Sequence, residues 1–381
     1  MDDSISGAER IQAAIGLEQL DRVPVAPLVM YFAAGFRGIS TKEFLNDPQG
    51  QAAAKEFVFE RMGGWDAWYS ASGPTTAGQL KARSVIQYKF PGDGLPDDAP
   101  LPQLNEQPFM SPEDYDLIPA VGYSNWYNEY RTRLYPSLDA AALLTTELAR
   151  TDSVNRRFYQ KWHVERQVPI LAGVVINHPI DTLSFARTFS QFCLDILRRP
   201  DKVLAAAEVI CSAHIEGAVN RCKEIGISGV WIGGFRTGAS FMSPKQYHKF
   251  VAPFIDRMVR DLLNKGLTPL LHFDADWTAF LPFLRDLPAG KCILAVDQAT
   301  DLFKAKKVLG DRICLMGNVA PDTMVLGTVD ETVQECRRLI DVVGAGGGFI
   351  LSSGCEVPYN TKPKNLAALI ETAKTYKPRR T

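Results

Sequence analysis

The sequence predicts a (β/α)8 barrel, the TIM-barrel class of α/β fold, with an N-terminal helix and a long insertion after the second strand. From residue 168 onward, short apolar runs alternate with longer helical patterns, which is typical of a parallel sheet built from βα units. The 381 residues are also enough for eight such units in one domain. A doubly wound parallel sheet is the structural alternative, because it uses the same units.

Eight short apolar runs are the predicted strands. Near-continuous hydrophobic runs of this kind indicate burial on both faces of a sheet. In chain order they cover residues 23–29, 66–71, 168–175, 229–234, 268–273, 292–296, 313–319 and 348–353. Eight strands, each followed by a helix, favour a barrel over an open sheet.

The helices between these strands carry recognisable end signals. One helix is expected to begin with Ser243 as N-cap and Pro244 as its first residue, and to end at Gly266. Another begins at Thr328, where Glu331 completes a capping box. The N-terminal stretch MDDSISGAERIQAAI is acidic and then amphipathic, which predicts a helix rather than a secretory signal.

Residues 75–165 interrupt the alternation of strands and helices. This stretch is first rich in Pro, Asp and Gly, then contains the aromatic segment YSNWYNEYRTRLYP and a helical pattern around DAAALLTTELAR. A connection this long inside a compact barrel is usually functional. We therefore expect a single domain of residues 1–381 in which residues 75–165 form an insertion that acts as a lid.

Composition and charge indicate a globular protein that acts on small molecules. Apolar residues make up 46% of the chain and charged residues 22%, the usage of a soluble globular protein. A net charge of -1 gives no basic footprint for nucleic acid or an anionic membrane, and no run approaches eighteen apolar residues. The seven cysteines are scattered, which suits a reducing compartment. We expect a cytoplasmic protein without nucleic-acid or membrane partners.

Polar side chains gather where the predicted strands end. In a barrel, the reacting groups lie at the carboxyl ends of strands and on the loops that follow. This rule selects Tyr31, Asn177, His178, Arg236, His272, Asp274, Asp276, Asp297, Asn318, Cys355 and Glu356. Each alone has an ordinary alternative, a hydrogen bond that caps a loop, so their convergence from several strands is what indicates a site.

Three of these residues have the chemistry of metal ligands. His272 and Asp274 stand two positions apart at a strand end and therefore face the same way. Gly354 allows a sharp turn that can aim Cys355 at the same point. Imidazole, carboxylate and thiolate are all zinc ligands, and three protein ligands with one open position make a catalytic site. The alternative is a hydrogen-bonded strand-end histidine and an inert buried cysteine.

The chain resembles the uroporphyrinogen decarboxylase superfamily along most of its length. The similar segments are residues 8–27, 243–266, 315–341 and 348–376, and their most specific parts are GNV (317–319) and SSGCEVPYNTKPKNL (352–366). The resemblance implies a (β/α)8 barrel. It also implies one of two activities, because the superfamily contains decarboxylases and zinc-dependent methyltransferases that work with corrinoids.

The resemblance favours the methyltransferases. Their metal motif is H-x-C after strand five and a further Cys after strand eight, and the matching residues here are His272, Asp274 in place of the Cys, and Cys355. Decarboxylases carry an arginine-rich stretch after the first strand, where this chain has PLVMYFAAGFRG with Arg37 as its single cation. A substrate with many carboxylates would be poorly bound by that segment.

The expected activity is zinc-dependent transfer of a methyl group between a small methylated substrate, such as an aryl methyl ether, and a corrinoid. Zinc would act as a Lewis acid. The corrinoid (cobalamin) is expected on a separate carrier protein, because nothing in the sequence resembles a cobalamin domain. The superfamily makes a homodimer reasonable.

Catalytic and substrate-binding roles are assigned to the remaining strand-end residues and to aromatic rings. Expected catalytic residues are Asp276, His178, Arg236 and Glu356. Expected substrate-binding residues are Tyr31, Trp68, Tyr69, Asn177, Asn318 and Tyr359. The rings of Tyr31, Trp65, Trp68 and Tyr69 would form a wall for a small apolar or aryl substrate. The insertion's Trp126, Tyr127 and Tyr130 either extend this wall or pack in the core.

Two other functions remain open from the sequence. One is a metal-independent decarboxylase in which Asp274, Asp276 or Arg236 orients a carboxylated substrate. The other is a barrel without catalytic activity that binds a corrinoid or tetrapyrrole as a carrier or regulator.

Overall fold

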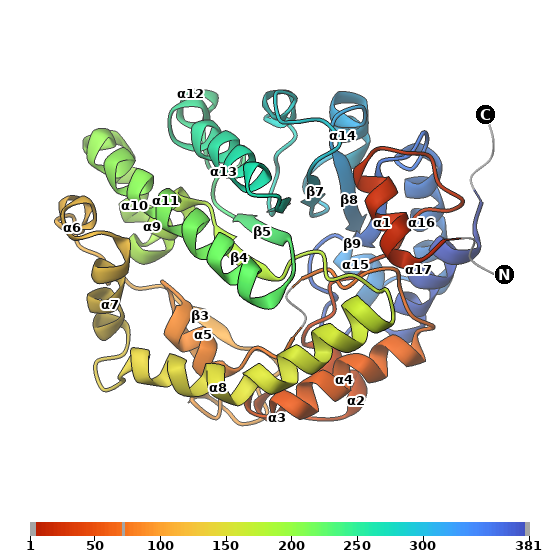
Figure 1. Ribbon diagram of the computed structural model, residues 1–381, viewed down its shortest axis with the longest axis horizontal. Helices are drawn as coiled ribbons and strands as arrows, with labels where there is room; N and C mark the ends of the chain where they lie inside the picture. Colours follow the sequence, from red (N-terminus) through yellow and green to blue (C-terminus); the bar gives the residue numbers. More distant parts are fainter. Residues whose placement is uncertain (1–4, 71–72, 378–381) are drawn as a thin grey trace.

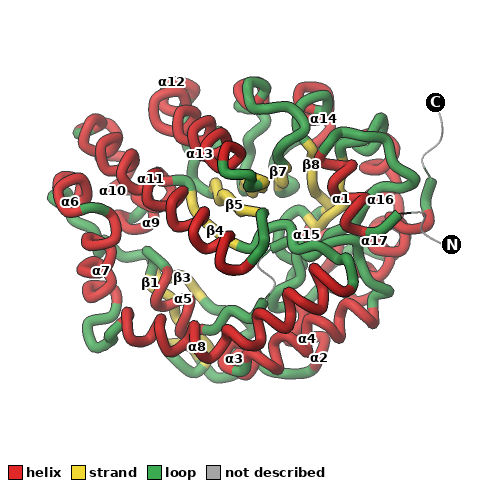
Figure 2. Tube along the Cα trace, viewed as in Figure 1, coloured by secondary structure: helices red, strands yellow, loops and turns green. Residues whose placement is uncertain are grey.

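The computed structural model describes residues 5–70 and 73–377, and its centre is a six-stranded parallel sheet ringed by helices (Figures 1 and 2). The strands lie in the order of the chain and are β4 (Val174–Asn177), β5 (Gly229–Gly234), β6 (Thr268–Phe273), β7 (Ile293–Val296), β8 (Cys314–Val319) and β9 (Phe349–Ser353). Every neighbouring pair is parallel, so each connection crosses over the sheet. The predicted α/β fold with a parallel sheet is confirmed.

The first two predicted strands are extended segments joined to the sheet by single bridges. Val25 bridges to Leu351 of β9, and Trp68 bridges to Ile170, just before β4. The two segments also contact each other, because the amide of Asp66 donates to the carbonyl of Val25 at 2.9 Å. Pro24 and Pro27 remove two amide donors from the first segment, which explains why no longer ladder forms. The last residue predicted for the second strand, residue 71, lies outside the described residues.

The third strand is displaced from its predicted position. The prediction covers residues 168–175, whereas β4 begins at Val174. Pro169 cannot donate to a ladder, and only the bridge at Ile170 forms ahead of β4. The five later strands agree with the prediction to within one residue at each end.

The two faces of the sheet carry different cores. Alternate residues such as Trp231, Ala295 and Met316 pack together with Ile11 of α1 (Gly7–Ile15) in one cluster. We call this the inner face of the sheet. The residues between them, such as Leu294, pack against the surrounding helices in a larger cluster. Alternation with both faces buried is what the near-continuous apolar runs predicted.

Helices follow the strands as the sequence predicts. They are α9 (Pro179–Arg187), α10 (Phe189–Arg198) and α11 (Pro200–Ile225) after β4; α12 (Pro244–Gln246) and α13 (Ala252–Asn264), joined by a π-helical turn, after β5; a 3-10 turn (Leu281–Leu284) after β6; α14 (Leu302–Leu309) after β7; α15 (Pro321–Val325) and α16 (Val329–Val342) after β8; and α17 (Pro363–Thr375) after β9. Thr328 forms the expected capping box, Ser243 is the expected N-cap and also forms a capping box with Gln246, and Gly266 has a φ of +73°.

Among the described residues, one helix is long and apolar enough to cross a membrane, α11. Its contacts with β4, α6 (Asp114–Val121), α9 and α13 place it in the helical layer that covers the sheet. Core helices of globular proteins pass the same test of length and composition.

The N-terminal third and residues 75–165 lie beside the central sheet (Figure 1). After α1, the chain forms α2 (Phe32–Arg37), α3 (Thr41–Asn46) and α4 (Pro48–Arg61). Residues 75–165 contain α5 (Ala77–Arg83), β1 (Gln87–Pro91), β2 (Gly94–Leu95), β3 (Gln103–Asn105), α6, α7 (Tyr123–Leu134), α8 (Ala140–Tyr159) and a π-helical turn (Gln160–Glu165). Its use as a lid stays a prediction.

The aromatic residues of this stretch belong mostly to its own core. Trp126 is buried and its indole N–H donates to Asp114 at 2.8 Å, and buried Tyr130 donates to the carbonyl of Val85 at 2.7 Å. Tyr127 is partly buried and stacks on Tyr123. Of the two interpretations of these rings, core packing therefore describes Trp126 and Tyr130.

A buried ion network ties the first helix to both N-terminal extended segments. Arg10 of α1 and Arg22 both contact the carboxylate of Asp66, with nitrogen to oxygen distances of 2.9 and 2.8 Å. The same carboxylate accepts the amide of Val25 at 2.8 Å. All three charged side chains are nearly inaccessible to solvent. Asp66 therefore joins three parts of the chain by charge-assisted hydrogen bonds.

We predict that Asp66→Asn lowers the free energy of unfolding by about 3 kcal/mol, because it removes the carboxylate that the buried Arg10 and Arg22 share, while Arg10 keeps its pair with Asp21 at 2.8 Å. Urea unfolding of both proteins measures the difference. Asp97→Asn is the matched control, since Asp97 pairs with Lys42 at an exposed position and should cost about 1 kcal/mol or less. Equal losses in the two variants would contradict the prediction.

Candidate metal centre

Three side chains of ligand type meet at the carboxyl end of the sheet. His272 lies in β6, Asp274 follows that strand directly, and Cys355 lies two residues after β9. His272 Nε2 is 3.2 Å from Asp274 Oδ1 and 3.8 Å from Cys355 Sγ. One ligand atom from each residue lies within 4.8 Å of those of the other two. The structure therefore brings together the three residues predicted as metal ligands.

The orientation of the imidazole is set from its other side. The hydroxyl of Tyr69 lies 2.6 Å from His272 Nδ1, so Nε2 is the nitrogen left to face Asp274 and Cys355. The indole of Trp231 packs against the same ring, with centroids 4.0 Å apart and the ring planes tilted by 32°. Metal-binding histidines commonly have such a hydrogen bond at the second nitrogen, because it fixes the tautomer and the ring direction.

These residues fit a metal ion by their polar contacts and by their spacing. Asp274 Oδ1 is buried and lies 3.2 Å from His272 Nε2, but it forms no hydrogen bond of good geometry with that nitrogen or with any other described residue, which is costly unless a cation or another donor compensates it. In a tetrahedral zinc site, bonds of about 2.0 Å to N or O and about 2.3 Å to S place neighbouring ligand atoms about 3.3–3.6 Å apart. The observed separations of 3.2 and 3.8 Å are close to those values.

The thiol of Cys355 is held in its neutral form when no cation is present. Burial raises its pKa, and the negative charge of Asp274 raises it further. A nearby divalent cation acts in the opposite direction, because it stabilises the thiolate. The group of side chains therefore suits a positive charge at its centre better than none.

A second group of titratable residues lies beside Cys355. Glu356 accepts the amide of Tyr31 at 2.7 Å, and burial raises its pKa to about 7. The positive charge of Lys55 on α4 acts against this rise in the pKa of Glu356. Burial lowers the pKa of Lys55 to about 8, and the negative charge of Glu356 acts against that decrease. A buried carboxylate and a buried ammonium group therefore lie close enough to influence each other's charge beside the triad.

Comparison with known proteins assigns this geometry to a family. A family model described as "Uroporphyrinogen decarboxylase (URO-D)" matches residues 6–376. The chain belongs to the uroporphyrinogen decarboxylase family. The resemblance inferred from the sequence is thereby confirmed.

Two curated relatives and one solved structure illustrate the similarity. The uroporphyrinogen decarboxylase of Syntrophotalea carbinolica is 29% identical over 137 residues, 36% of this chain and 39% of the relative. That of Chlorobium phaeobacteroides is 30% identical over 144 residues, 37% and 40% of the two chains. The chain thus spans about two fifths of the curated relatives it matches. A methyltransferase from Methanosarcina mazei shares the fold with a TM-score of 0.71 at 19% identity, over 97% of this chain and 99% of that one.

The expected catalytic residues occupy different positions in this uroporphyrinogen decarboxylase family chain. Glu356 lies beside the triad. The carboxylate of Asp276 accepts the amide of Thr278 at 2.8 Å. Arg236 is half-buried and pairs with Glu106 at 2.7 Å, so it links the loop after β5 to residues 75–165. Catalytic roles for these side chains stay predictions.

His178 has the contacts of a helix cap. It is 1% exposed, its Nδ1 accepts the amide of Ile180 at 3.2 Å, and its Nε2 donates to the carbonyl of Val251 at 3.1 Å. Both ring nitrogens are therefore engaged with the backbone. A catalytic role for His178 stays a prediction, and the function proposed below does not use it.

The expected substrate-binding residues also separate into two groups. Tyr69 is on the inner face and contacts His272, whereas Trp68 points to the outer face and packs among Trp65, Trp162 and Phe59. Consecutive residues of an extended segment point to opposite faces, so both could not line one site. The half-buried residues of the expected set are Tyr31, Asn177, Asn318 and Tyr359. The Tyr359 ring packs over Gly35 of α2, and Asn318 donates to the carbonyls of Asp297 and Thr300.

Two residues of the site were not expected from the sequence. Val175 of β4 pairs with Trp231 in the sheet and is 52% exposed, so it offers an apolar surface on the inner face. Lys55 is the buried cation next to Glu356. A lysine within the apolar run QAAAKEFVF was the available signal for Lys55, whereas exposure of a strand valine has no sequence signal.

We predict that His178→Asn weakens the acid sensitivity of the fold. Burial lowers the pKa of His178 to about 3 in the folded protein, against an ordinary value near 6.5. Its contribution to stability is thus present above pH 6.5 and lost as the pH falls toward 3. Asn retains an N-cap but does not titrate, so the slope of unfolding free energy against pH should change by about 1.4 kcal/mol per unit in that range.

Urea unfolding at pH 7.5, 6 and 5 measures this slope for both proteins. A constant offset between them at every pH, with equal slopes, would contradict the assignment of a neutral buried imidazole to His178.

Proposed function

We propose that this protein is a zinc-dependent methyltransferase that moves a methyl group between a small methylated substrate and a corrinoid. The observation that carries the proposal is the triad of His272, Asp274 and Cys355, in which the buried Oδ1 of Asp274 lies 3.2 Å from His272 Nε2 and forms no hydrogen bond of good geometry with the described residues. A donor set of nitrogen, oxygen and sulfur favours zinc over magnesium or calcium, which prefer oxygen ligands. The methyltransferase name of the Methanosarcina mazei protein that shares the fold supports the same choice.

We also infer that the sheet and its two edge segments form an eight-stranded barrel. β6 and β9 are three strand spacings apart, which is about 14 Å in a flat sheet. Even so, His272 of β6 and Cys355 beyond β9 are in contact. Strong curvature toward the inner face accounts for that contact, and the bridges at Val25, Leu28 and Trp68 support closure around the remaining gap.

The residues around the triad have separable tasks in this proposal. When bound, zinc would act as a Lewis acid on the oxygen, nitrogen or sulfur atom that gains or loses the methyl group. Tyr69 holds the ring of His272 in one direction, and Trp231 covers a face of that ring. Val175 offers apolar contact to a methyl or aryl group on the same face of the sheet. Lys55 and Glu356 would bind the polar end of the substrate.

The corrinoid partner is proposed to be carried by a second protein. The corrinoid would approach the carboxyl end of the sheet, where His272, Asp274 and Cys355 meet. A homodimeric, cytoplasmic enzyme that acts on a small methyl donor or acceptor completes the proposal.

A decarboxylase is the second candidate function, and the names of the curated relatives favour it. In that function Asp274, Asp276 or Arg236 would orient a carboxylated substrate. Arg236, the cation named for this function, is already engaged, because it pairs with Glu106 at 2.7 Å. Arg37 is exposed and stacks on Phe57 of α4. Methyl transfer is therefore the better supported of the two.

The first test is metal content. Protein purified without chelator is expected to hold about one zinc per chain, and His272→Ala and Cys355→Ala should lose it because each removes one of three ligands. Elemental analysis gives the result. Cys193→Ala is the matched control, since Cys193 is a half-buried thiol on α10 outside the triad. A correctly folded wild-type chain that stays free of metal after zinc supplementation would sink the proposal.

The second test is turnover. With reduced cobalamin, the wild-type protein is expected to demethylate at least one compound among methyl ethers, amines and thioethers, and His272→Ala should lower the rate by about 100-fold or more. The absorbance of methylcobalamin measures the transfer. Metal-independent release of carbon dioxide from a porphyrinogen carboxylate would establish the decarboxylase instead. Tight corrinoid binding without turnover would leave a binding protein without catalytic activity.

A further inference from the structure

We propose that residues 297–301, the segment between β7 and α14, are positioning residues that set the separation of the two loops carrying the metal ligands. We call residues 297–301 the brace. The inference rests on the metal site proposed above. It adds residues that do not bind the metal themselves but hold the loops of its ligands in position. Its two contact surfaces are the loop 274–278, which carries Asp274, and the turn at Gly354, which precedes Cys355.

The brace is joined to the first ligand loop, residues 274–278, by hydrogen bonds, most of them from side chains of the brace to the backbone of the loop. The carboxylate of Asp297 accepts the amide of Ala275 at 2.8 Å, and the hydroxyl of Thr300 donates to the carbonyl of Ala275 at 2.9 Å. The same hydroxyl accepts the amide of Trp277 at 3.0 Å. The amide of Asp301 donates to the hydroxyl of Thr278 at 3.0 Å. Both polar backbone groups of Ala275 are therefore bonded to the brace.

These bonds hold a strained residue in place. Ala275 has a φ of +67°, a left-handed conformation that non-glycine residues rarely adopt. Such a conformation persists when the surrounding structure over-determines it. The hydrogen bonds with Asp297 and Thr300 keep Ala275 in this conformation. Ala275 is the residue directly after Asp274. The direction of the Asp274 carboxylate thus depends on bonds made one residue away.

The brace also contacts the second ligand loop. A Cβ atom added at Gly354 would lie 3.2 Å from the amide nitrogen of Gln298 and 3.5 Å from the Cα of Asp297. The absence of a side chain at residue 354 lets the turn that carries Cys355 approach this closely. One segment of five residues therefore touches the backbone on both sides of the triad.

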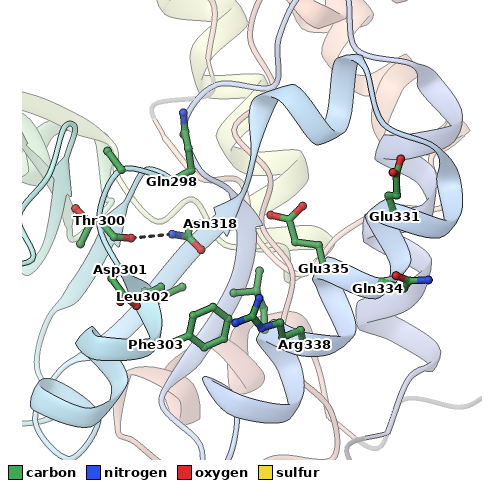
Figure 3. A pocket seen from close by; sticks show the side chains of 12 residues that line it. Gln298, Thr300, Asp301, Leu302, Phe303, Asn318, Glu331, Gln334, Glu335 and Arg338 are labelled. Carbon is green, nitrogen blue, oxygen red and sulfur yellow. Dashed lines mark hydrogen bonds between the residues drawn. The ribbon is translucent and has the colours of Figure 1, made fainter.

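The far side of the brace is supported mainly by hydrogen bonds. A cavity of about 650 Å³ lies there, lined by the brace, Asn318 and residues of α16 such as Glu335 and Arg338 (Figure 3). The Asn318 amide crosses to the brace and donates to the carbonyls of Asp297 and Thr300 at 3.0 and 3.3 Å. Packed side chains cannot replace lost hydrogen bonds beside an open cavity, so the position of the brace depends on these bonds.

The test compares Thr300→Val with Thr300→Ser. Valine keeps the shape and removes the hydroxyl, whereas serine keeps the hydroxyl. Thr332→Val is the matched control, because Thr332 is also buried and its hydroxyl donates to the carbonyl of Thr328 in its own helix. The probes are the zinc affinity, by competition with a chelator, and the visible absorption spectrum of the Co²⁺-loaded protein, which reports ligand geometry. Thermal unfolding of the metal-free proteins reports general stability.

Thr300→Val is expected to lower zinc affinity by about 10–100-fold, the effect of removing a partner that orients a ligand. Its cobalt spectrum should change, while Thr300→Ser and Thr332→Val should bind zinc as the wild type does. Gly354→Ala tests the other side of the brace and should change the cobalt spectrum as well. Wild-type affinity and an unchanged spectrum in both Thr300→Val and Gly354→Ala would overturn the inference.

Amide hydrogen exchange of metal-free protein separates this inference from the proposed function. Thr300→Val should speed exchange at Ala275 and Trp277, whose amides lie in the loop 274–278. If the wild-type protein binds no zinc but Thr300→Val still speeds exchange at Ala275 and Trp277, the proposed function is refuted. The inference that residues 297–301 hold the loop 274–278 in place then still stands. Unchanged exchange there would overturn the inference whatever the metal content.

Discussion

A buried carboxylate oxygen that forms no hydrogen bond of good geometry with the described residues is the constraint on which the interpretation of this molecule depends. Asp274 Oδ1 is removed from water, and its near neighbours are an imidazole nitrogen and a thiol. Leaving such an oxygen uncompensated is unfavourable, and a shared cation compensates it while also favouring the thiolate of Cys355. The sharp turn at Gly354, the bond between Tyr69 and His272 and the curvature of the sheet all serve to bring these three groups together.

The buried ion network and the candidate metal site lie at opposite ends of the sheet. The network of Arg10, Arg22 and Asp66 joins α1 to both extended segments, and the turn before β7 packs against the end of α1. The ligand triad lies where the strands finish. This division is typical of βα folds, in which loops after the strands change with function while the other end maintains the structure.

The sequence predicted the later strands closely and the first two poorly, for a physical reason. Runs buried on both faces, such as residues 229–234, have one register that hides every side chain. Pro24, Pro27 and Pro169 remove ladder donors, and no pattern of hydrophobicity reports that loss. The alternation rule found His272 and Asp274, and the resemblance supported Cys355. Tyr69 was expected to bind substrate, and its bond to His272 was not foreseen, because which rings meet His272 is decided by packing across strands.

Helix α1 lies at the amino-terminal ends of the strands. Its first turn bonds to the carbonyl of Gln167 ahead of β4, and its last residues approach Gly290 ahead of β7. The triad and its surroundings are at the other end. A tether or immobilisation tag fused ahead of α1 would therefore anchor the molecule with its reactive end facing solution. Such an orientation suits surface-based measurement of how a bulky carrier approaches.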